Sequence, residues 1–570
     1  MSQQIEDLIS QGRYFEARTK AAALLVDSES LRVQQLYALA MSKCGVPEAA
    51  MQYLEPIYKK SQEDPETSGI LGGIYKELFI KTKEQRYAVL SRDTYLKNFT
   101  LTKSYYTGIN AATMSAIAGQ SKQGQQIALE VIGLLDGSHD SFWELATLAE
   151  AFLISKNREK AKELYTLVRG MVTSDWGKIN SIYNQLWLLN HYVAIPNELL
   201  KIFKPPTVAA FVGHMIDHPT RKQSRFPASI EAKVKESLAS SIASINAKIG
   251  YCSLACGGDI LFAEAMEEAG GEVNLFLPCD KNDFLEESVR FAGEHWVERC
   301  ERLIKRFPVT YITEENYKGY DDLFFLQSGV IFGAAIMRSD SSHTKPYLIT
   351  LLSAMDLKRK QGGTRDTLKM WPYPTTILNV NPDSFNTSSP VNPVAVSLEP
   401  VIEPSKELNR PVAYLLMADF PDTSSDQKEL LLKSLLAKAE GQSPLPIGLI
   451  WNGDVLLVAY STIEGTTELT KILTGLLSRF NKKGNLKISL HVGPVTIDPI
   501  ESGIGKKIEG TAAAILHQLH AHSVADEVHA SAPYAMELAL NIQNYSIDFA
   551  GKFILPETHQ EQEIYKIGSI

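Results

Sequence analysis

Residues 248–278 read KIGYCSLACGGDILFAEAMEEAGGEVNLFLP, and this stretch decides the fold of the middle of the chain. An apolar run leads into a turn with two adjacent glycines, then a helical pattern, and then a second apolar run. Strand–helix–strand alternation with glycine at the joins predicts a parallel sheet covered by helices. The same alternation continues on both sides, with candidate strands at 207–215, 308–313 and 345–353 and helices near 229–248 and 322–337. We therefore predict a parallel α/β domain over residues 205–371.

The glycine turn of this domain is a candidate ligand site. Backbone N–H groups at a helix N-terminus attract phosphate, and Asp259 follows Gly257 and Gly258 where a carboxylate can cap the helix or reach a ribose hydroxyl. The first strand ends in Gly213-His214, so both turns should fall at the carboxyl edge of one sheet, where ligands bind in open α/β folds. The alternative is that the glycines only make tight turns and Asp259 only caps the helix. We see no nucleophile–base pair, which favours binding over hydrolysis.

This segment resembles the SLOG superfamily of Rossmann-like nucleotide-binding domains, in which a strand, a Gly-x-Asp turn, a helix and a further glycine-led strand recur in that order. QGGTRDTLKMW at 361–371 is similar to a later Gly-rich element of that family. The resemblance implies a nucleotide-like ligand, with Glu264 on the helix after the turn reaching the same pocket. The other residues implied to line it are Gly213, His214, Gly257, Gly258, Asp259, Gly362, Gly363 and Thr364.

Residues 1–204 have the pattern of stacked helical repeats. Small and aromatic residues recur at intervals that run from the mid-thirties to about forty residues. The segments are LYALAMSKCG at 36–45, LGGIYKELF at 71–79, YTGINAATMSAIAG at 106–119 and WELATLAEAFL at 143–153. This period is typical of helix-turn-helix repeats such as the tetratricopeptide (TPR) type, and the alternative is an ordinary helical bundle. Together with the α/β domain, the repeats resemble the TRAFs-binding region of the apoptosis signal-regulating kinases and its bacterial relatives, through GGIYKELF and SYYTGINAA. No kinase motif follows, so the resemblance implies a scaffold that binds a partner protein.

The remaining chain divides into a linker and a second α/β segment. Residues 372–411 hold eight of the 26 prolines, which predicts an extended linker over 372–410. Residues 411–570 form the last domain, where apolar runs end in Asp419 and surround Gly453-Asp454. Two aspartates at the ends of adjacent strands could hold Mg²⁺ or Mn²⁺ against a triphosphate.

The order of motifs in 411–570 resembles that of class III nucleotide cyclases, with a ferredoxin-like α/β fold. LLMAD (415–419), WNGDVLLVAY (451–460), KISLHVGPV (487–495) and IEGTAAAILHQLHAHS (508–523) carry the likeness. The resemblance implies that Asp419 and Asp454 bind the metals and that the domain pairs as a homodimer, with His491 in the core. The alternative for the two aspartates is a retained fold signature without metal.

Four other positions depart from the cyclase pattern. The base-selecting lysine falls at Ile450, its polar partner at Gly505, the ribose-orienting asparagine at Ala514 and the charge-stabilising arginine at Gln518. Losing one preorganised charge stabiliser costs roughly 2.7–4 kcal/mol of transition-state stabilisation, so losing several should leave negligible turnover. We assign no catalytic residue and do not predict an active cyclase. Rescue could come from a partner chain or from nearby cations at Lys506, Lys507, His517 or His520.

Composition narrows the class of protein. The chain has 570 residues and a net charge of −9, without a Lys/Arg stripe that would indicate nucleic-acid binding. Its apolar runs are shorter than the roughly 20 residues that cross a bilayer, its N-terminus lacks a signal-peptide pattern, and its five cysteines lack zinc spacing. We predict a cytoplasmic signalling scaffold or sensor without membrane contact. The alternatives are an active purine nucleotide cyclase and a nucleotide-cleaving effector that uses the central pocket.

Overall fold

The computed structural model describes most of the chain in two compact units. It describes residues 2–569 except 27, 136, 138–140, 173–174, 223, 320, 354–363, 387–411, 421–443, 481–485, 498–506, 542–544 and 557. One unit comprises Met1–Pro205 with Ala550–Phe553, and the other comprises Pro206–Phe549 with Ile554–Ile570. Within the described residues, no helix combines the length and the apolar character needed to span a bilayer.

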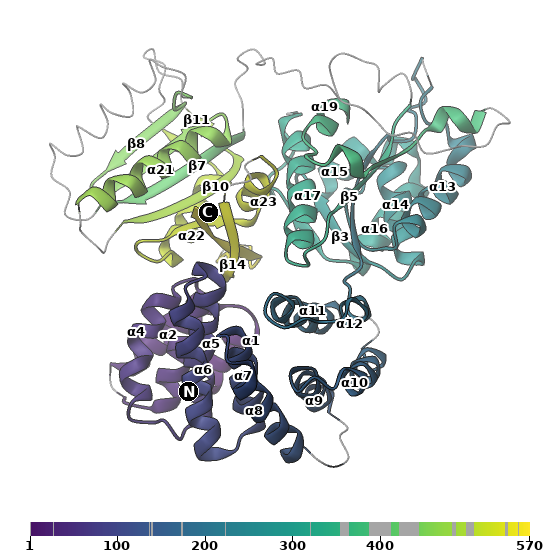
Figure 1. The fold of residues 1–570 in the computed structure, drawn as a ribbon. Helices are drawn as coiled ribbons and strands as arrows, with labels where there is room; N and C mark the ends of the chain where they lie inside the picture. The colour runs from purple at the N-terminus through teal and green to yellow at the C-terminus, as the bar shows by residue number, and fades with distance from the viewer. Residues whose placement is uncertain are drawn as a thin grey trace. The chain divides into compact units, whose positions relative to one another are not determined.

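The first unit is built almost entirely from helices, and α1 to α10 pack largely in sequence order (Figure 1). They are α1 (Ser2–Ser10), α2 (Tyr14–Leu25), α3 (Leu31–Lys43), α4 (Pro47–Tyr58), α5 (Pro65–Thr82), α6 (Gln85–Thr102), α7 (Tyr105–Ile117), α8 (Ser121–Leu134), α9 (Phe142–Ile154), α10 (Arg158–Gly170), α11 (Trp176–Asn190) and α12 (Asn197–Ile202). One continuous apolar core runs from α3 to the end of α12, as stacked repeats require.

Small residues set the spacing between paired helices in this unit. A side chain at Gly72 on α5 would place its Cβ 2.6 Å from the ring of Tyr95 on α6. The Ser91 hydroxyl, also on α6, donates to the Gly72 carbonyl oxygen at 2.7 Å. The glycine therefore lets the α6 ring and hydroxyl lie directly on the α5 backbone. The small residues of LGGIYKELF thus allow the close approach of α5 and α6.

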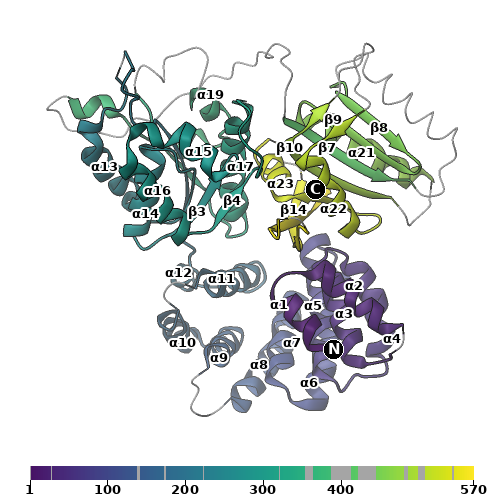
Figure 2. The ribbon, with the colours of Figure 1, turned by 180° about the vertical axis from the view of Figure 1, so that it is seen from behind.

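The second unit begins with a six-stranded parallel sheet in the order β4-β3-β2-β1-β5-β6, seen from opposite sides in Figures 1 and 2. Its strands are β1 (Thr207–Gly213), β2 (Ala247–Cys252), β3 (Glu272–Leu277), β4 (Val309–Tyr311), β5 (Tyr347–Leu351) and β6 (Ile377–Val380). Its helices are α13 (Glu231–Ser244), α14 (Gly258–Glu268), α15 (Lys281–Ser288), α16 (Glu294–Arg306), α17 (Asp322–Asp340) and α19 (Thr364–Lys369). The strand order reverses between β1 and β5, which makes this the topological switch point of the sheet.

One predicted boundary is wrong. The linker was expected to begin at residue 372, yet β6 pairs in parallel with β5 along four residues, from Leu348↔Ile377 to Leu351↔Val380. The sheet therefore continues into the proline-rich stretch, because prolines that flank a short edge strand leave its inward hydrogen bonds intact. The central domain extends to about residue 386, the last described residue before the undescribed stretch 387–411.

The C-terminal part of the second unit is a seven-stranded mixed sheet in the order β14-β15-β13-β10-β7-β9-β8. The strands are β7 (Val412–Asp419), β8 (Gly448–Asn452), β9 (Val455–Tyr460), β10 (Lys487–Pro494), β13 (Val528–Ser531), β14 (Tyr545–Ile554) and β15 (Glu561–Ser569), and β11 (Thr496–Ile497) pairs separately with β12 (Ile508–Glu509). Its helices are α21 (Ile463–Phe480), α22 (Thr511–His522) and α23 (Ala532–Asn541). The predicted class of helical repeats, parallel α/β sheet and C-terminal α/β sheet is confirmed.

The contacts of the β10 side chains show which helices cover each face of this sheet. Ser489 contacts His520 on α22, and Gly493 lies against Ala512 of the same helix. The alternating residues Ile488, Leu490 and Val492 join the apolar core that contains residues of α21 and α23. Because successive strand residues point to opposite faces, α22 covers one face of the sheet, and α21 and α23 cover the other.

Candidate functional site

The predicted turn residues of the central domain come together at the carboxyl edge of the sheet. The chain leaves β1 at Gly213-His214 and runs beside the turn that enters α14. The Gly258 amide donates to the His214 carbonyl oxygen at 3.0 Å, and the Ile216 amide donates to the Cys256 carbonyl oxygen at 3.1 Å. This edge lies at the switch point of the sheet, the position where open α/β folds bind ligands.

The two glycines of this turn are required by the chain itself. Gly257 has φ +101°, and a Cβ there would lie 2.5 Å from the backbone nitrogen of Ile216. A Cβ at Gly258 would lie 2.9 Å from the Phe211 ring and 3.1 Å from the His214 carbonyl oxygen. Only glycine allows the segment after β1 to pack on the start of α14. Part of the N–H surface expected to receive a phosphate is therefore already hydrogen-bonded to protein.

Asp259 closes the same turn from inside. Its Oδ2 accepts a hydrogen bond from the Ala255 amide at 3.2 Å, and the residue is only 9% exposed. Burial raises the pKa of Asp259 to about 7, against an opposing effect of the Ala255 hydrogen bond. A carboxyl group that titrates near neutral pH can exchange a proton at physiological pH.

Polar side chains that sequence reasoning missed complete this edge. The Ser353 amide, just after β5, donates to Nε2 of the buried His214 at 3.4 Å. Asn379 on β6 accepts from Thr350 at 2.7 Å and donates to the Leu352 carbonyl oxygen at 3.0 Å. Asn379 lay in the stretch interpreted as a linker, so its only signal was the apolar pattern of ILNV around it.

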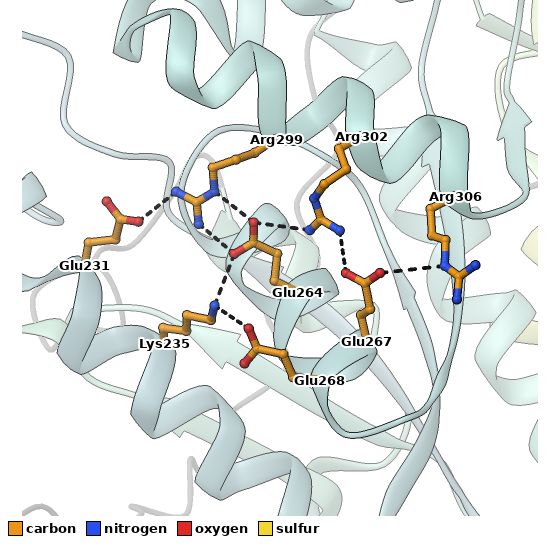
Figure 3. Close-up of polar contacts among 8 residues, drawn as sticks. All are labelled: Glu231, Lys235, Glu264, Glu267, Glu268, Arg299, Arg302 and Arg306. Carbon is orange, nitrogen blue, oxygen red and sulfur yellow. Dashed lines mark hydrogen bonds and ion pairs between the residues drawn. The ribbon is translucent and has the colours of Figure 1, made fainter.

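The structure corrects the expectation for Glu264, whose carboxylate is paired with charged side chains of α13 and α16 (Figure 3). Its carboxylate is held in a two-pronged contact with Arg299 of α16, with Nε at 2.8 Å and Nη2 at 2.7 Å. Lys235 of α13 lies at 3.5 Å and Arg302 at 3.6 Å. The physical reason is helical geometry, since five residues turn a helix by about 500°, which separates Glu264 from Asp259 by about 140° around the axis.

The contacts with Arg299, Lys235 and Arg302 set the pKa of Glu264. Burial acts to raise its pKa, but hydrogen bonding to Arg299 and the charges of Arg299, Lys235 and Arg302 outweigh burial, so the pKa lies below its usual value. Figure 3 shows Glu264 as one member of a chain of carboxylates and cations that joins α13, α14 and α16. Glu264 therefore serves helix packing.

Two of the remaining predicted ligand residues, Gly362 and Gly363, lie outside the described residues. Thr364 is the first residue of α19. Cys252 and Cys256, which form a CxxxC pair in the sequence, are buried and free, and burial raises the pKa of Cys256 to about 12. These two thiols are packing residues, as expected.

The two aspartates of the C-terminal domain lie at the same end of adjacent strands. Asp419 ends β7 and is paired in register with Val455 of β9, and Asp454 immediately precedes that residue in the β8–β9 turn. The amide of Phe420 donates to the carbonyl oxygen of Asp454 at 2.8 Å. The structure therefore brings together the pair that the sequence predicted to be neighbours.

The carboxylate of Asp419 is engaged by cationic and imidazole groups of its own domain. Nε2 of His520, on α22, lies 2.9 Å from Oδ1, and Nζ of Lys487, on β10, lies 3.6 Å from Oδ2. Nδ1 of His520 lies 2.8 Å from the hydroxyl of Ser489, which is fully buried and so has no access to a substrate. Burial lowers the pKa of His520 although Asp419 acts to raise it.

These residues do not fit a divalent-metal site. Over the described part of the chain, no three His, Cys, Asp or Glu side chains are grouped as a metal would require. The ammonium of Lys487 and Nε2 of His520 occupy the surroundings of Asp419 where a metal site needs further oxygen ligands. His520 therefore contacts the carboxylate of Asp419 itself.

Helix α22 exposes the positions where a cyclase needs its polar groups. Ala514 and Gln518 are exposed one turn apart, with His517 exposed between them. The start of α22 is capped by Glu315, which follows β4 in the same unit and accepts from the amide (3.1 Å) and hydroxyl (2.6 Å) of Thr511. Lys507 pairs with Glu509 at 2.8 Å. Gly505 and Lys506 lie outside the described residues.

His491 is a core residue, as the sequence indicated. It is 1% exposed on β10, and its Nδ1 lies 2.6 Å from the hydroxyl of Ser531. Burial lowers the pKa of His491 to about 3, so the imidazole is neutral at physiological pH. It contributes to packing between β10 and β13.

Comparison with known proteins identifies the first helices. Residues 13–115 match the family model described as Tetratricopeptide Repeats-Sensor (TPR-S). None of the curated proteins compared matches the chain. A thermophilic TPR protein from Thermus thermophilus is a structural neighbour with 15% identity, covering 32% of this chain and 96% of that chain at a TM-score of 0.27. Over residues 13–115 the helical repeats are therefore similar to TPR-type sensor repeats.

Two nucleotide cyclases are similar to a smaller part of the chain. The guanylate cyclase domain of RhGC from Catenaria anguillulae in complex with GTP has 12% identity, covering 28% of this chain and 97% of that chain at a TM-score of 0.23. An adenylyl cyclase from P. aeruginosa has 13% identity, covering 28% of this chain and 94% of that chain at a TM-score of 0.22.

Proposed function

We propose that this protein is a signalling scaffold and sensor without turnover. Its repeats bind a partner protein, its central domain binds a nucleotide-like ligand at the switch-point edge, and its C-terminal domain is a cyclase homology domain that supports homodimerisation or regulation. The repeats and the central domain together would act as the TRAFs-binding region that their sequence resembles. The observation that carries the absence of turnover is the engagement of Asp419 by His520 and Lys487.

Three features of the C-terminal domain support this proposal. The position of the base-selecting lysine holds Ile450, and the exposed face of α22 presents Ala514 and Gln518. Neither can hold a ribose and a phosphate charge as asparagine and arginine do, and each missing charge stabiliser is worth roughly 10²–10³ in rate. Asp419 and Asp454 are then retained for the fold of the β8–β9 turn and the end of β7, without a resident metal.

The test is direct. Purified protein incubated with ATP or GTP and Mn²⁺ should give no 3′,5′-cyclic nucleotide by liquid chromatography and mass spectrometry. Titration with Mn²⁺ followed by electron paramagnetic resonance should show no site tighter than about 1 mM in the wild type, because the carboxylate of Asp419 is already paired. The variant His520→Ala should bind Mn²⁺ more tightly than the wild type. Cyclic product formed by the wild type at an ordinary enzyme rate would refute the proposal.

Ligand binding and partner binding are tested separately. Native mass spectrometry of the purified chain should reveal a co-purifying nucleotide-like molecule, which Gly257→Ala should lose. Crosslinking of the full chain to its partner in cells should place the crosslinks on the helical repeats. A ligand-free wild type that also binds no added nucleotide would remove the sensor part of the proposal and leave the scaffold part standing.

One observation favours a second candidate function. The pKa of Asp259 near 7 suits general acid–base work, so the central edge could cleave a nucleotide. Release of free base from a nucleotide pool by the wild type, abolished in Asp259→Ala, would select this function. If the wild type releases no free base, ligand binding remains the proposed role of the central edge.

A further inference from the structure

Helix α11 contacts helices that precede it by several repeats. The Lys76 ammonium, on α5, donates to Oε1 of Gln185 on α11 at 2.8 Å, and Nε2 of Gln185 donates to the carboxylate of Glu150 on α9 at 2.6 Å. The rings of Phe79 on α5 and Tyr192, just after α11, lie 6.0 Å apart. In a regular solenoid each repeat contacts only its neighbours, so α11 is not simply the next layer of the stack.

The surface beneath α11 is formed by alternate helices of the repeats. Lys76 comes from α5, Thr113 from α7 and Glu150 from α9, and the Thr113 hydroxyl donates to the same carboxylate oxygen that Gln185 contacts. We call the surface around these three residues the odd-helix face. This face presents the ammonium of Lys76 and the carboxylate of Glu150, and the side-chain amide of Gln185 on α11 accepts from the first and donates to the second. A side-chain amide is suited to this point because it carries both an acceptor and a donor.

Helix α11 itself has the pattern of a helix bound in a groove. Ile179, Ile182, Leu186 and Leu189 are buried at spacings of three, four and three residues, Leu188 is buried beside this stripe, and Ser181 is exposed. These four residues belong to the same apolar cluster as the residues of α5, α7 and α9. Apolar anchors at this spacing are how amphipathic helices bind in grooves of other proteins.

The chain enters and leaves this face from α10. After α11, the next helix α12 returns to α10, where Lys162 pairs with Glu198 at 2.6 Å and the rings of Tyr165 and Phe203 meet edge to face at 5.6 Å. Helix α11 is therefore an excursion of the chain between two contacts on α10. A segment tethered at both ends in this way can leave its face without unravelling its neighbours.

We propose that α11 is an internal occupant of the odd-helix face, and that the partner of the repeats is an amphipathic helix of the same chemistry. That helix carries aliphatic side chains at the spacing of α11 and an amide directly before its third anchor, where Gln185 precedes Leu186. The proposal rests on the proposed partner-binding function of the repeats. The proposal adds that the partner binds to the odd-helix face and that it must displace α11.

The strength of this competition follows from tethering. A tethered segment acts at an effective concentration on the order of millimolar. If a separate helix binds the empty face with a Kd of about 1–10 μM, tethered α11 leaves the face free in only roughly one molecule in 10²–10³, and the apparent Kd rises by the inverse of that fraction. Releasing α11 should raise the affinity for such a helix by about 10²- to 10³-fold.

The experiment measures binding of a fluorescein-labelled peptide with the sequence of residues 175–192 to the full chain by fluorescence anisotropy. In the variant Ile182→Glu a carboxylate replaces a buried anchor, which releases α11, whereas the control Ser181→Glu places the same charge at an exposed residue. The Ile182→Glu chain should bind the peptide at least 100-fold more tightly than the wild type and the control. A peptide carrying Gln185→Leu should bind the released chain about tenfold more weakly.

Equal and weak binding by all three chains, with the helical circular dichroism of Ile182→Glu retained, overturns the proposal. Hydrogen exchange of the wild type decides the matter if Ile182→Glu loses more than one helix. Amides of α11 that exchange faster than those of α5 and α7 support an occupant that detaches, and equal protection shows an integral part of the core. Peptide binding by the released chain that captures no natural partner refutes the partner-binding function alone.

Discussion

The contact between Gly72 and Tyr95 gives a sharp prediction about the repeats. In Gly72→Ala the new Cβ would lie 2.6–2.9 Å from three atoms of a ring that is 2% exposed, so the α5–α6 pair must separate. Overpacking of this kind costs about 1–3 kcal/mol, while replacing glycine by alanine inside a helix returns up to about 1 kcal/mol. We expect Gly72→Ala to lower the local stability of α5 and α6 by up to about 2 kcal/mol.

The neighbouring glycine supplies the matched control. At Gly73 the nearest atom to a new Cβ is the Tyr95 hydroxyl oxygen at 3.7 Å, an ordinary contact, so Gly73→Ala should gain up to about 1 kcal/mol. Native-state hydrogen exchange of α5 and α6 peptides reports the opening free energy of each variant without requiring two-state unfolding of the whole chain. A difference of about 1–3 kcal/mol corresponds to a roughly 5- to 150-fold difference in exchange rate. Amides of Gly72→Ala that exchange no faster than those of Gly73→Ala would refute the reasoning.

Three further predictions concern the central domain. Arg299→Met removes the main partner of the buried Glu264, and by native-state hydrogen exchange it should lower the opening free energy of α14. The loss should lie near the lower end of about 3–5 kcal/mol, because two other cations, Lys235 and Arg302, remain near the carboxylate. The control Arg306→Met, at an exposed residue, should change the same free energy by less than about 0.5 kcal/mol. The pKa of Asp259 is about 7 in the folded chain against an ordinary 3.8, so its contribution to the free energy of unfolding is intact below about pH 4 and is lost as the pH rises to 7. Thermal unfolding of Asp259→Asn at pH 5 and pH 8 should therefore show a smaller decline than the wild type, and an equal decline would contradict the assignment. Gly257→Ala, which combines φ +101° with a backbone clash, should lower the melting temperature of the second unit, and an unchanged value would mean that the turn can open freely.

The sequence predicted the elements that depend on local pattern. Glycines at the joins of 248–278 marked β2, α14 and β3 because strand, turn and helix each have their own periodicity. The pairing of Asp419 beside Asp454 followed from one apolar run that ends in Asp419, a second that surrounds Gly453-Asp454, and the motif order that these runs share with class III cyclases. The strand, turn and helix patterns are short-range features, and one sequence is enough to find them.

The parts that sequence reasoning missed depend on distant partners. Glu264 was assigned to the ligand edge because nothing local shows that Arg299, 35 residues later, lies on the facing helix. The contact between Asp419 and His520 joins residues 101 positions apart, and strand β6 is four residues long inside a proline-rich stretch. Such contacts are set by tertiary packing, which periodicity does not encode.

The covered turn at the switch-point edge has a kinetic consequence. The Gly258 amide at the N-terminus of α14 is already bonded to the His214 carbonyl oxygen, so an anion that needs this amide would reach it only after that segment moves aside. Arrival would then be governed by how often the protein opens, and the observed association rate should level off as ligand concentration rises. Such an edge responds to sustained exposure and ignores brief encounters.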